Sequence, residues 1–119
     1  MTKRILGIDD ESGFCDVLQD LLESDGYQVE APRQLASAIG TALLGEHDLI
    51  ILDLRMPGMN GLEIARLFKQ KALHTPILII SGYITEDIPQ QLNTLGIHNV
   101  VSKPSGVSQL RHAVATALA

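Results

Sequence analysis

Acidic side chains, a serine and a lysine follow short apolar runs in this chain, and these residues could carry chemistry. Asp53 ends the run 49–53, in which four apolar residues precede the carboxylate. Asp9 and Asp10 follow the run 5–8, Ser81 follows the run 77–80, and Lys103 follows the run 99–102. Apolar runs of this length are typical of strands buried on both faces of a parallel sheet. We therefore expect these side chains together at the carboxyl edge of such a sheet, where open α/β folds place their ligand sites.

Three carboxylates at one edge would repel one another, because a desolvated charge is costly unless it is paired or bound to a metal. Mg²⁺ would remove that repulsion, since it takes oxygen ligands, favours one or two carboxylates, and keeps waters and phosphate oxygens. A carboxylate can accept a phosphoryl group as an acyl phosphate. Lys103 would then neutralise one phosphoryl oxygen, and the Ser81 hydroxyl would donate a hydrogen bond to another. The residue types predict a metal-assisted phosphoryl-transfer site.

Each group also has an ordinary structural interpretation. Asp9 and Asp10 could cap the following helix, Asp53 could be a simple strand-end acid, and Ser81 could belong to a turn. A lysine before a proline, as at Lys103, is common. The joint occurrence favours the functional interpretation, because four different strands would each deliver a suitable group to the same edge.

Strand and helix patterns alternate five times along the chain. The predicted strands are 4–8, 27–31, 49–53, 77–80 and 99–102, and the predicted helices are 12–25, 34–44, 61–71, about 85–96 and 107–118. The segment 54–59 reads as a loop rich in turn residues. Asn60 is expected to cap the helix 61–71, and Thr85 is expected to cap the helix at about 85–96. Gly26 is expected to end the helix 12–25, and Gly45 the helix 34–44. This alternation predicts βαβ units, with a parallel sheet and helices on both faces.

Composition sets the class of protein. The 119 residues predict one domain, 1–119, and 45% hydrophobic content fits a globular chain. No apolar run approaches the ~20 residues that span a bilayer, and no signal peptide precedes the first strand, so we expect a cytoplasmic protein without membrane contact. A net charge of −5 with scattered arginines argues against nucleic-acid binding. Cys15 is alone and is expected to be a buried hydrophobe, and the histidines, which show no metal-ligand spacing, are expected in surface or loop positions: His47, His74, His98 and His112.

Four motifs in this order resemble the receiver domain of two-component response regulators along essentially the whole chain. They are the segments 8–11 (IDDE), 53–61 (DLRMPGMNG), 80–82 (ISG) and 101–104 (VSKP). The central stretch is highly specific, and the other three gain force from their order and spacing. The resemblance implies a flavodoxin-like α/β fold, with five parallel strands in the order 2-1-3-4-5 and five helices.

The resemblance also assigns roles to residues. It implies that Asp53 is the phosphoacceptor, that Asp10 and Asp53 bind Mg²⁺ directly, and that Asp9 acts largely through water. The backbone carbonyl of Arg55 matches the family's main-chain metal ligand. Ser81 and Lys103 match the hydroxyl and the lysine that contact phosphate. The implied partner is a sensor histidine kinase or a phosphotransfer protein, and the implied function is a phosphorylation switch that catalyses only its own phosphorylation and slow dephosphorylation.

The chain departs from the family pattern at two positions. Val100 stands where receivers usually carry a switching Tyr or Phe, so Tyr83, two residues after Ser81, is the alternative candidate for the lever. Gly7 stands in the first strand where a bulky residue is usual, and it either weakens that strand or lets a helix approach closely. The output surface is expected to combine the helix 85–96, Val100 and the last helix, for an unidentified partner, an output domain or a phosphorylation-dependent homodimer.

Two other functions are open at this point. A phosphatase of the haloacid class would also use an aspartate after a strand, but it would want a second acid two residues later, where this chain has Arg55. A receiver-like binding module that has given up phosphate would be expected to lack an acid or the lysine, and all are present. The sequence leaves open whether the chain is a stand-alone receiver or the front of a longer regulator.

Overall fold

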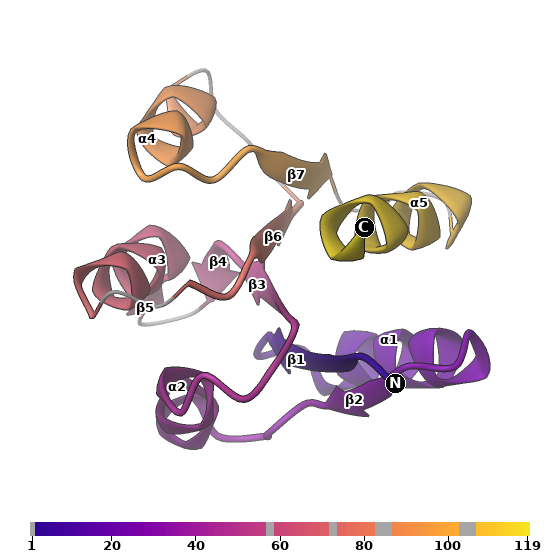
Figure 1. The fold of residues 1–119 in the computed structure, drawn as a ribbon. Coiled ribbons are helices and arrows are strands. Elements are labelled where there is room, and N and C mark those ends of the chain that lie inside the picture. Colours follow the sequence, from indigo (N-terminus) through magenta and orange to yellow (C-terminus); the bar gives the residue numbers. More distant parts are fainter. Residues whose placement is uncertain (1, 57–58, 72–73, 83–86, 103–106) are drawn as a thin grey trace.

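The computed structural model describes residues 2–56, 59–71, 74–82, 87–102 and 107–119. Five parallel strands form one sheet (Figure 1): β2 (Gln28–Glu30), β1 (Arg4–Ile8), β3 (Leu49–Asp53), β6 (Ile77–Ser81) and β7 (Asn99–Ser102), in that spatial order. This is the predicted order 2-1-3-4-5 when only the strands of this sheet are counted. The first, third and fifth strands have the predicted bounds, and the second is shorter.

Helices cover both faces of the sheet, as predicted. Figure 1 shows α1 (Ser12–Ser24) and α5 (Val107–Leu118) on one face, and α2 (Leu35–Leu43), α3 (Gly61–Gln70) and α4 (Ile88–Thr94) on the other. The residues of β3 alternate between two apolar cores. Ile50 and Leu52 pack with α2, α3 and α4, whereas Leu49 and Ile51 pack with α1 and α5. All five residues of β3 are buried, so the strand that ends at Asp53 is buried on both faces.

The segment after Asp53 differs from the predicted loop. Two short strands, β4 (Arg55–Met56) and β5 (Met59–Asn60), pair antiparallel, with Arg55 opposite Asn60 and Met56 opposite Met59. The turn residues between them predicted a change of direction, and the structure adds backbone pairing on either side of it. This pairing brings Asn60 back beside the end of β3.

The fourth helix is shorter than predicted. It begins at Ile88, after Asp87 in the capping position, so the prediction of a helix beginning after Thr85 is wrong; Thr85 itself lies outside the described residues. Pro89 explains the late start, because proline has no N–H to donate and is tolerated only in a helix's first turn. Gly26 and Gly45 follow α1 and α2 with φ of 97° and 70°, the left-handed backbone expected at helix ends.

Gly7 lets α1 approach the sheet closely. A Cβ at this position would lie 3.2 Å from Cδ2 of Leu18 on α1, while β1 keeps its full length and its pairing with β2 and β3. Of the two predicted consequences of Gly7, the structure therefore has the close approach. Cys15 on the same helix is buried, as predicted.

His47 differs from the other histidines, because it is buried although it lies in the loop between α2 and β3. Its Nε2 is 2.9 Å from Oε1 of Glu30, and Glu30 also accepts from Arg4 at 3.2 Å. The Nδ1 atom of His47 is buried and has no hydrogen-bond partner. Sequence spacing predicted only the loop position, since the neighbours of His47, such as Glu30 and Thr75, are distant in the sequence.

No helix of the described residues is long and apolar enough to cross a membrane.

Candidate functional site

The polar groups singled out in the sequence gather at the carboxyl edge of the sheet. Asp53 and Ser81 are the last residues of β3 and β6, and Asp9 directly follows β1. The register aligns these strand ends, because Ile8 pairs with Leu52 and Asp53 pairs with Ile80. The predicted convergence is therefore present for the groups that the structure describes.

Asp9, Asp10 and Asp53 form an acidic cluster. One carboxylate oxygen from each lies within 4.8 Å of those of the other two, and no other group of three acids, histidines or cysteines in the described part of the chain is arranged to hold a metal ion. Asp53 is only 2% exposed and Asp9 is also buried, whereas Asp10 is exposed. Three negative charges at this spacing repel, and an all-oxygen donor set of this kind fits a hard divalent cation. The cluster therefore suits Mg²⁺.

The turn after β1 fixes the direction of the first acid. Oδ1 of Asp9 accepts a hydrogen bond of 2.9 Å from the backbone N–H of Glu11, and Sγ of Cys15 lies 3.5 Å from the backbone oxygen of Asp9. The capping position of α1 is occupied by Glu11, whose side chain makes no capping bond. The alternative that Asp9 or Asp10 serves as the helix cap is therefore wrong.

The N-terminus of α3 is held against the residue that ends β3. Oδ1 of Asn60 accepts from the backbone N–H of Leu62 at 2.9 Å, which confirms the predicted cap, and the N–H of Gly61 donates to the carbonyl of Leu54 at 2.9 Å. A Cβ on Gly61 would lie 2.6 Å from Cα of Leu54 and would also press on the carbonyl oxygen of Asp53. Only glycine fits there without moving the backbone. The sequence motif 53–61 includes Gly61 but does not predict this close contact, although a glycine directly after a helix cap is a signal for one.

The structure describes some of the remaining candidate residues and not others. Ser81 is fully buried at the end of β6, and it pairs in register with Ser102, the residue before Lys103. Lys103 and Tyr83 lie outside the described residues. Arg55 is placed by its backbone in β4, two residues after Asp53. Val100 is partly buried on β7 and packs against the core shared by α2, α3 and α4.

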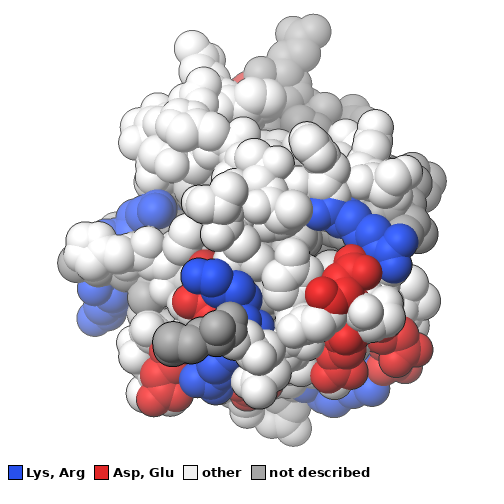
Figure 2. Space-filling model, turned by 45° about the vertical axis from the view of Figure 1, so that its right-hand side comes forward, with Lys and Arg blue, Asp and Glu red and all other residues white. Residues whose placement is uncertain are grey.

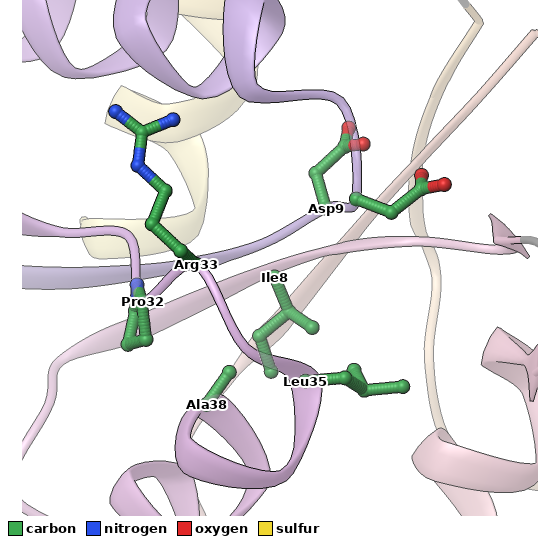
Figure 3. Close-up of a pocket in the computed structure, with 7 residues that line it drawn as sticks. Ile8, Asp9, Pro32, Arg33, Leu35 and Ala38 are labelled. Atoms are coloured by element: carbon green, nitrogen blue, oxygen red, sulfur yellow. The ribbon is translucent and has the colours of Figure 1, made fainter.

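A small pocket adjoins the acidic cluster (Figure 3). Its volume is about 100 Å³, and it is lined by Ile8, Asp9, Asp10, Pro32, Arg33, Leu35 and Ala38. Figure 3 shows Asp9 and Arg33 on the same side of an apolar floor made by Ile8, Leu35 and Ala38. The pocket therefore has room for several waters beside the acids. In the sequence Arg33 is one of several scattered arginines, because its position near the carboxyl edge of the sheet depends on the fold.

Charges of both signs alternate on the face of Figure 2. Acidic and basic side chains lie beside one another over its lower half, and its upper half carries few charges. Two of the exposed ion pairs are Arg33–Asp16 at 2.8 Å and Arg111–Asp25 at 2.9 Å. Phosphate backbones need a clustered positive surface, and the described residues on this face do not form one.

The chain matches the model of one protein family, the response regulator receiver domain, over residues 5–115. It is 29% identical over 114 residues to sporulation initiation phosphotransferase F of Bacillus subtilis, covering 96% of this chain and 92% of that protein. It is 30% identical over 116 residues to the uncharacterized transcriptional regulatory protein YkoG of the same organism, where it spans 96% of this chain but 50% of the relative.

Solved structures share the fold over nearly the whole chain. The non-phosphorylated HemR receiver domain of Leptospira biflexa superposes with a TM-score of 0.91 at 25% identity, covering 99% of this chain and 95% of that one. A response regulator receiver domain protein from Clostridium thermocellum gives a TM-score of 0.85 at 29% identity, covering 98% and 94%. With the family match, the shared fold and the acids at the strand ends, the chain belongs to the receiver domain family of two-component response regulators.

Proposed function

We propose that Asp53 accepts one phosphoryl group from a sensor histidine kinase or a phosphotransfer protein. The observation that carries this proposal is the buried Asp53 carboxylate at the end of a central strand, within 4.8 Å of two further carboxylates. A carboxylate oxygen of Asp53 attacks the phosphorus, the bond to the donor breaks, and its electron pair leaves with the donor. The product is an acyl phosphate on Asp53, which water slowly hydrolyses, so that inorganic phosphate leaves and the Asp53 carboxylate is regenerated.

Asp10 and Asp53 would hold Mg²⁺ directly, Asp9 would act largely through water, and the backbone carbonyl of Arg55 would add a ligand. The spacing of the three acids and the pocket beside Asp9 and Asp10, with room for waters, support this assignment. When bound, Mg²⁺ neutralises the clustered carboxylates and the phosphoryl oxygens. The protein contributes the fixed turn at Asp9 and the rigid end of β3, which keep the acids close together.

Ser81 and Lys103 would contact the phosphoryl oxygens. Ser81 ends the strand next to β3 and pairs in register with Ser102, and Lys103 is the next residue in the sequence. The hydroxyl would donate a hydrogen bond to one oxygen, and the ammonium would neutralise another. We expect Lys103→Ala to slow phosphoryl uptake and Ser81→Ala to have the smaller effect, because it removes a neutral donor.

The chain would catalyse only reactions of its own Asp53. A phosphatase of the haloacid class needs a second acid two residues after its nucleophile, and Arg55 occupies that position. A binding module without phosphate chemistry would not need the intact set of acids. We place the reaction in the cytoplasm, where a kinase could reach it.

Intact-mass spectrometry after incubation with acetyl phosphate and Mg²⁺ tests the assignment. We expect one added phosphoryl group on the wild-type chain, none on Asp53→Asn, and normal uptake on Asp20→Asn, a matched change on the exposed face of α1. Unchanged uptake by Asp53→Asn would remove Asp53 as the acceptor. Excess chelator should block uptake, and full phosphorylation in its presence would remove the metal from the proposal.

Signalling would rely on Tyr83, because Val100 has one short side-chain torsion and cannot sweep the volume of an aromatic ring. The output face would combine α4, Val100 and α5, for a partner, an output domain or a second phosphorylated copy. An open groove between β7 and α5, lined in part by Val100, Ser108 and His112, supports the part of this face near α5. The test compares phosphorylation-dependent binding in Tyr83→Ala and Val100→Ala. If Tyr83→Ala keeps the response and Val100→Ala abolishes it, the lever is Val100.

A further inference from the structure

Helix α2 has an outward face without charge. No charged residue occurs in the segment 34–45, although α2 lies on the outside of the molecule. Surface helices normally carry charged or polar residues opposite their buried stripe. Here Ala38 and Ala42 are buried against the sheet, and the opposite side exposes only small and apolar residues: Ala36, Ser37, Gly40, Leu43 and Leu44. We call these five residues the α2 face.

No contact among the described residues requires a glycine at position 40. Gly40 does not have a left-handed backbone, and a Cβ at this position would meet nothing within 4 Å. Glycine inside a helix is less favourable than alanine, so a glycine with free space around it is unexpected. A helix that must be approached closely from outside is one setting in which a missing side chain is useful.

Leu43 and Leu44 add exposed apolar area to this position. They are 37% and 68% exposed, and with Val17 at 60% on α1 they are the exposed large hydrophobic residues in the described part of the chain. Leu44 continues the row formed by Ala36 and Gly40 at intervals of four residues, which places the three side by side along the helix. Two of these three exposed hydrophobic side chains, Leu43 and Leu44, therefore lie next to Gly40 on the helix surface.

Residues of opposite charge flank α2 in the sequence. Arg33 precedes the helix, with its side chain turned toward Asp16 of α1, and Glu46 follows it, with its side chain beside Arg4; both side chains are exposed. If two copies of α2 packed antiparallel about a two-fold axis, Arg33 of each copy would approach Glu46 of the other. The same arrangement would place each helix N-terminus beside the partner's C-terminus, which the helix dipoles favour. A parallel arrangement would oppose like charges.

We propose that the α2 face docks against the α2 face of a second copy of this chain, in antiparallel orientation and independently of phosphorylation. Arg33 is bonded to Asp16 at 2.8 Å and Glu46 lies 3.8 Å from Arg4, but these pairs are solvent-exposed and therefore readily exchanged. One nine-residue helix offers less area than a stable interface needs, so the dimer is weak and depends on concentration.

Sedimentation equilibrium up to about 1 mM protein tests the interface, since weak association falls in this range. We expect the wild-type chain and Asp53→Asn to show the same reversible dimer, because the face lies apart from the acceptor. Leu44→Asp should raise the dissociation constant by about tenfold or more, as expected when a charge replaces a central apolar contact. Val17→Asp changes a similarly exposed residue on α1 and should leave association unchanged. A wild-type chain that stays monomeric, or equal loss in both variants, would overturn the proposal.

The orientation has its own test. Arg33→Glu and Glu46→Arg should each weaken the dimer, and the double variant should restore it, because it exchanges the signs at both ends. Cysteine trapping gives a second readout that tolerates weak binding. Gly40→Cys should form a disulfide dimer rapidly on oxidation and Val17→Cys slowly, while Cys15 is buried and does not compete. Equal trapping at both positions, or no restoration in the double variant, would contradict an antiparallel α2 pair.

Discussion

Gly61→Ala should damage both the fold and the site, because this glycine lies where α3 meets the end of β3. The added Cβ would lie 2.6 Å from Cα of Leu54 and against the carbonyl oxygen of Asp53. Carbon atoms in contact normally lie about 3.5–4.0 Å apart, so one of the two segments must move by about 1 Å. Both segments are backbone, and hydrogen bonds hold them: the N–H of Gly61 donates to Leu54, and the N–H of Leu54 donates to Ile80.

Overpacking of this kind costs about 2–3 kcal/mol of unfolding free energy, at the upper end of the usual range because no flexible side chain can yield. Unfolding entropies of about 2.1 cal/mol/K per residue give about 0.25 kcal/mol/K for a chain of this length, so the melting temperature should fall by roughly 10 °C. A shift of about 1 Å at Asp53 should also slow self-phosphorylation by ten- to a hundredfold.

Urea unfolding of Gly61→Ala and Gly40→Ala provides the matched comparison at low protein concentration. Gly40 is also in a helix, but its Cβ would meet nothing, so Gly40→Ala should raise stability by about 0.5–1 kcal/mol. The urea midpoints should therefore move in opposite directions with unchanged slopes. A Gly61→Ala chain within about 0.5 kcal/mol of wild type, phosphorylated at the normal rate, would refute the steric argument.

Three further changes have expected outcomes. Asn60→Ala removes the side-chain bond to the N–H of Leu62 and should lower the unfolding free energy by about 1 kcal/mol in urea titration; no change would show that water replaces the cap. Asp10→Asn should raise the melting temperature in metal-free buffer, since carboxylates within 4.8 Å repel by about 1 kcal/mol even at the dielectric constant of water, and a lower melting temperature would contradict this. Gly7→Ala should cost about 1 kcal/mol, less than Gly61→Ala, because the tip of Leu18 can move aside; a larger loss would mean that α1 cannot yield.

The features that the sequence predicted correctly depend on local pattern. The run 49–53 is apolar because both faces of β3 are covered, and the acid at its end marks where that cover stops. Gly26 after α1 has the left-handed backbone of a helix end, and Asn60 before α3 accepts from the N–H of Leu62, so both depend on residues close in the sequence. The convergence of Asp9 and Asp53 followed from one further step, since parallel strands in register end at the same edge.

The features that the sequence did not predict depend on contacts between distant segments. His47 is buried because it lies beside Glu30 and its backbone oxygen accepts from Thr75, and no local pattern encodes either neighbour. The β4–β5 pair arises because the chain folds back from Asp53 to the start of α3. Arg33 reaches the rim of the acidic pocket only because the segment after β2 crosses beside β1.

The proposed docking surface on α2 lies apart from the proposed output surface. Helix α2 lies on the face of the sheet opposite α1 and α5, whereas β7, near which the output surface is proposed, lies at the other end of the sheet (Figure 1). Docking through α2 would therefore leave the output surface of both copies accessible. Arg33 connects the docking region to the acidic site, because it lines the pocket beside Asp9 and Asp10 and would also approach Glu46 of the second copy. Any coupling between docking and phosphorylation would act through the charge of this one side chain at the mouth of the pocket.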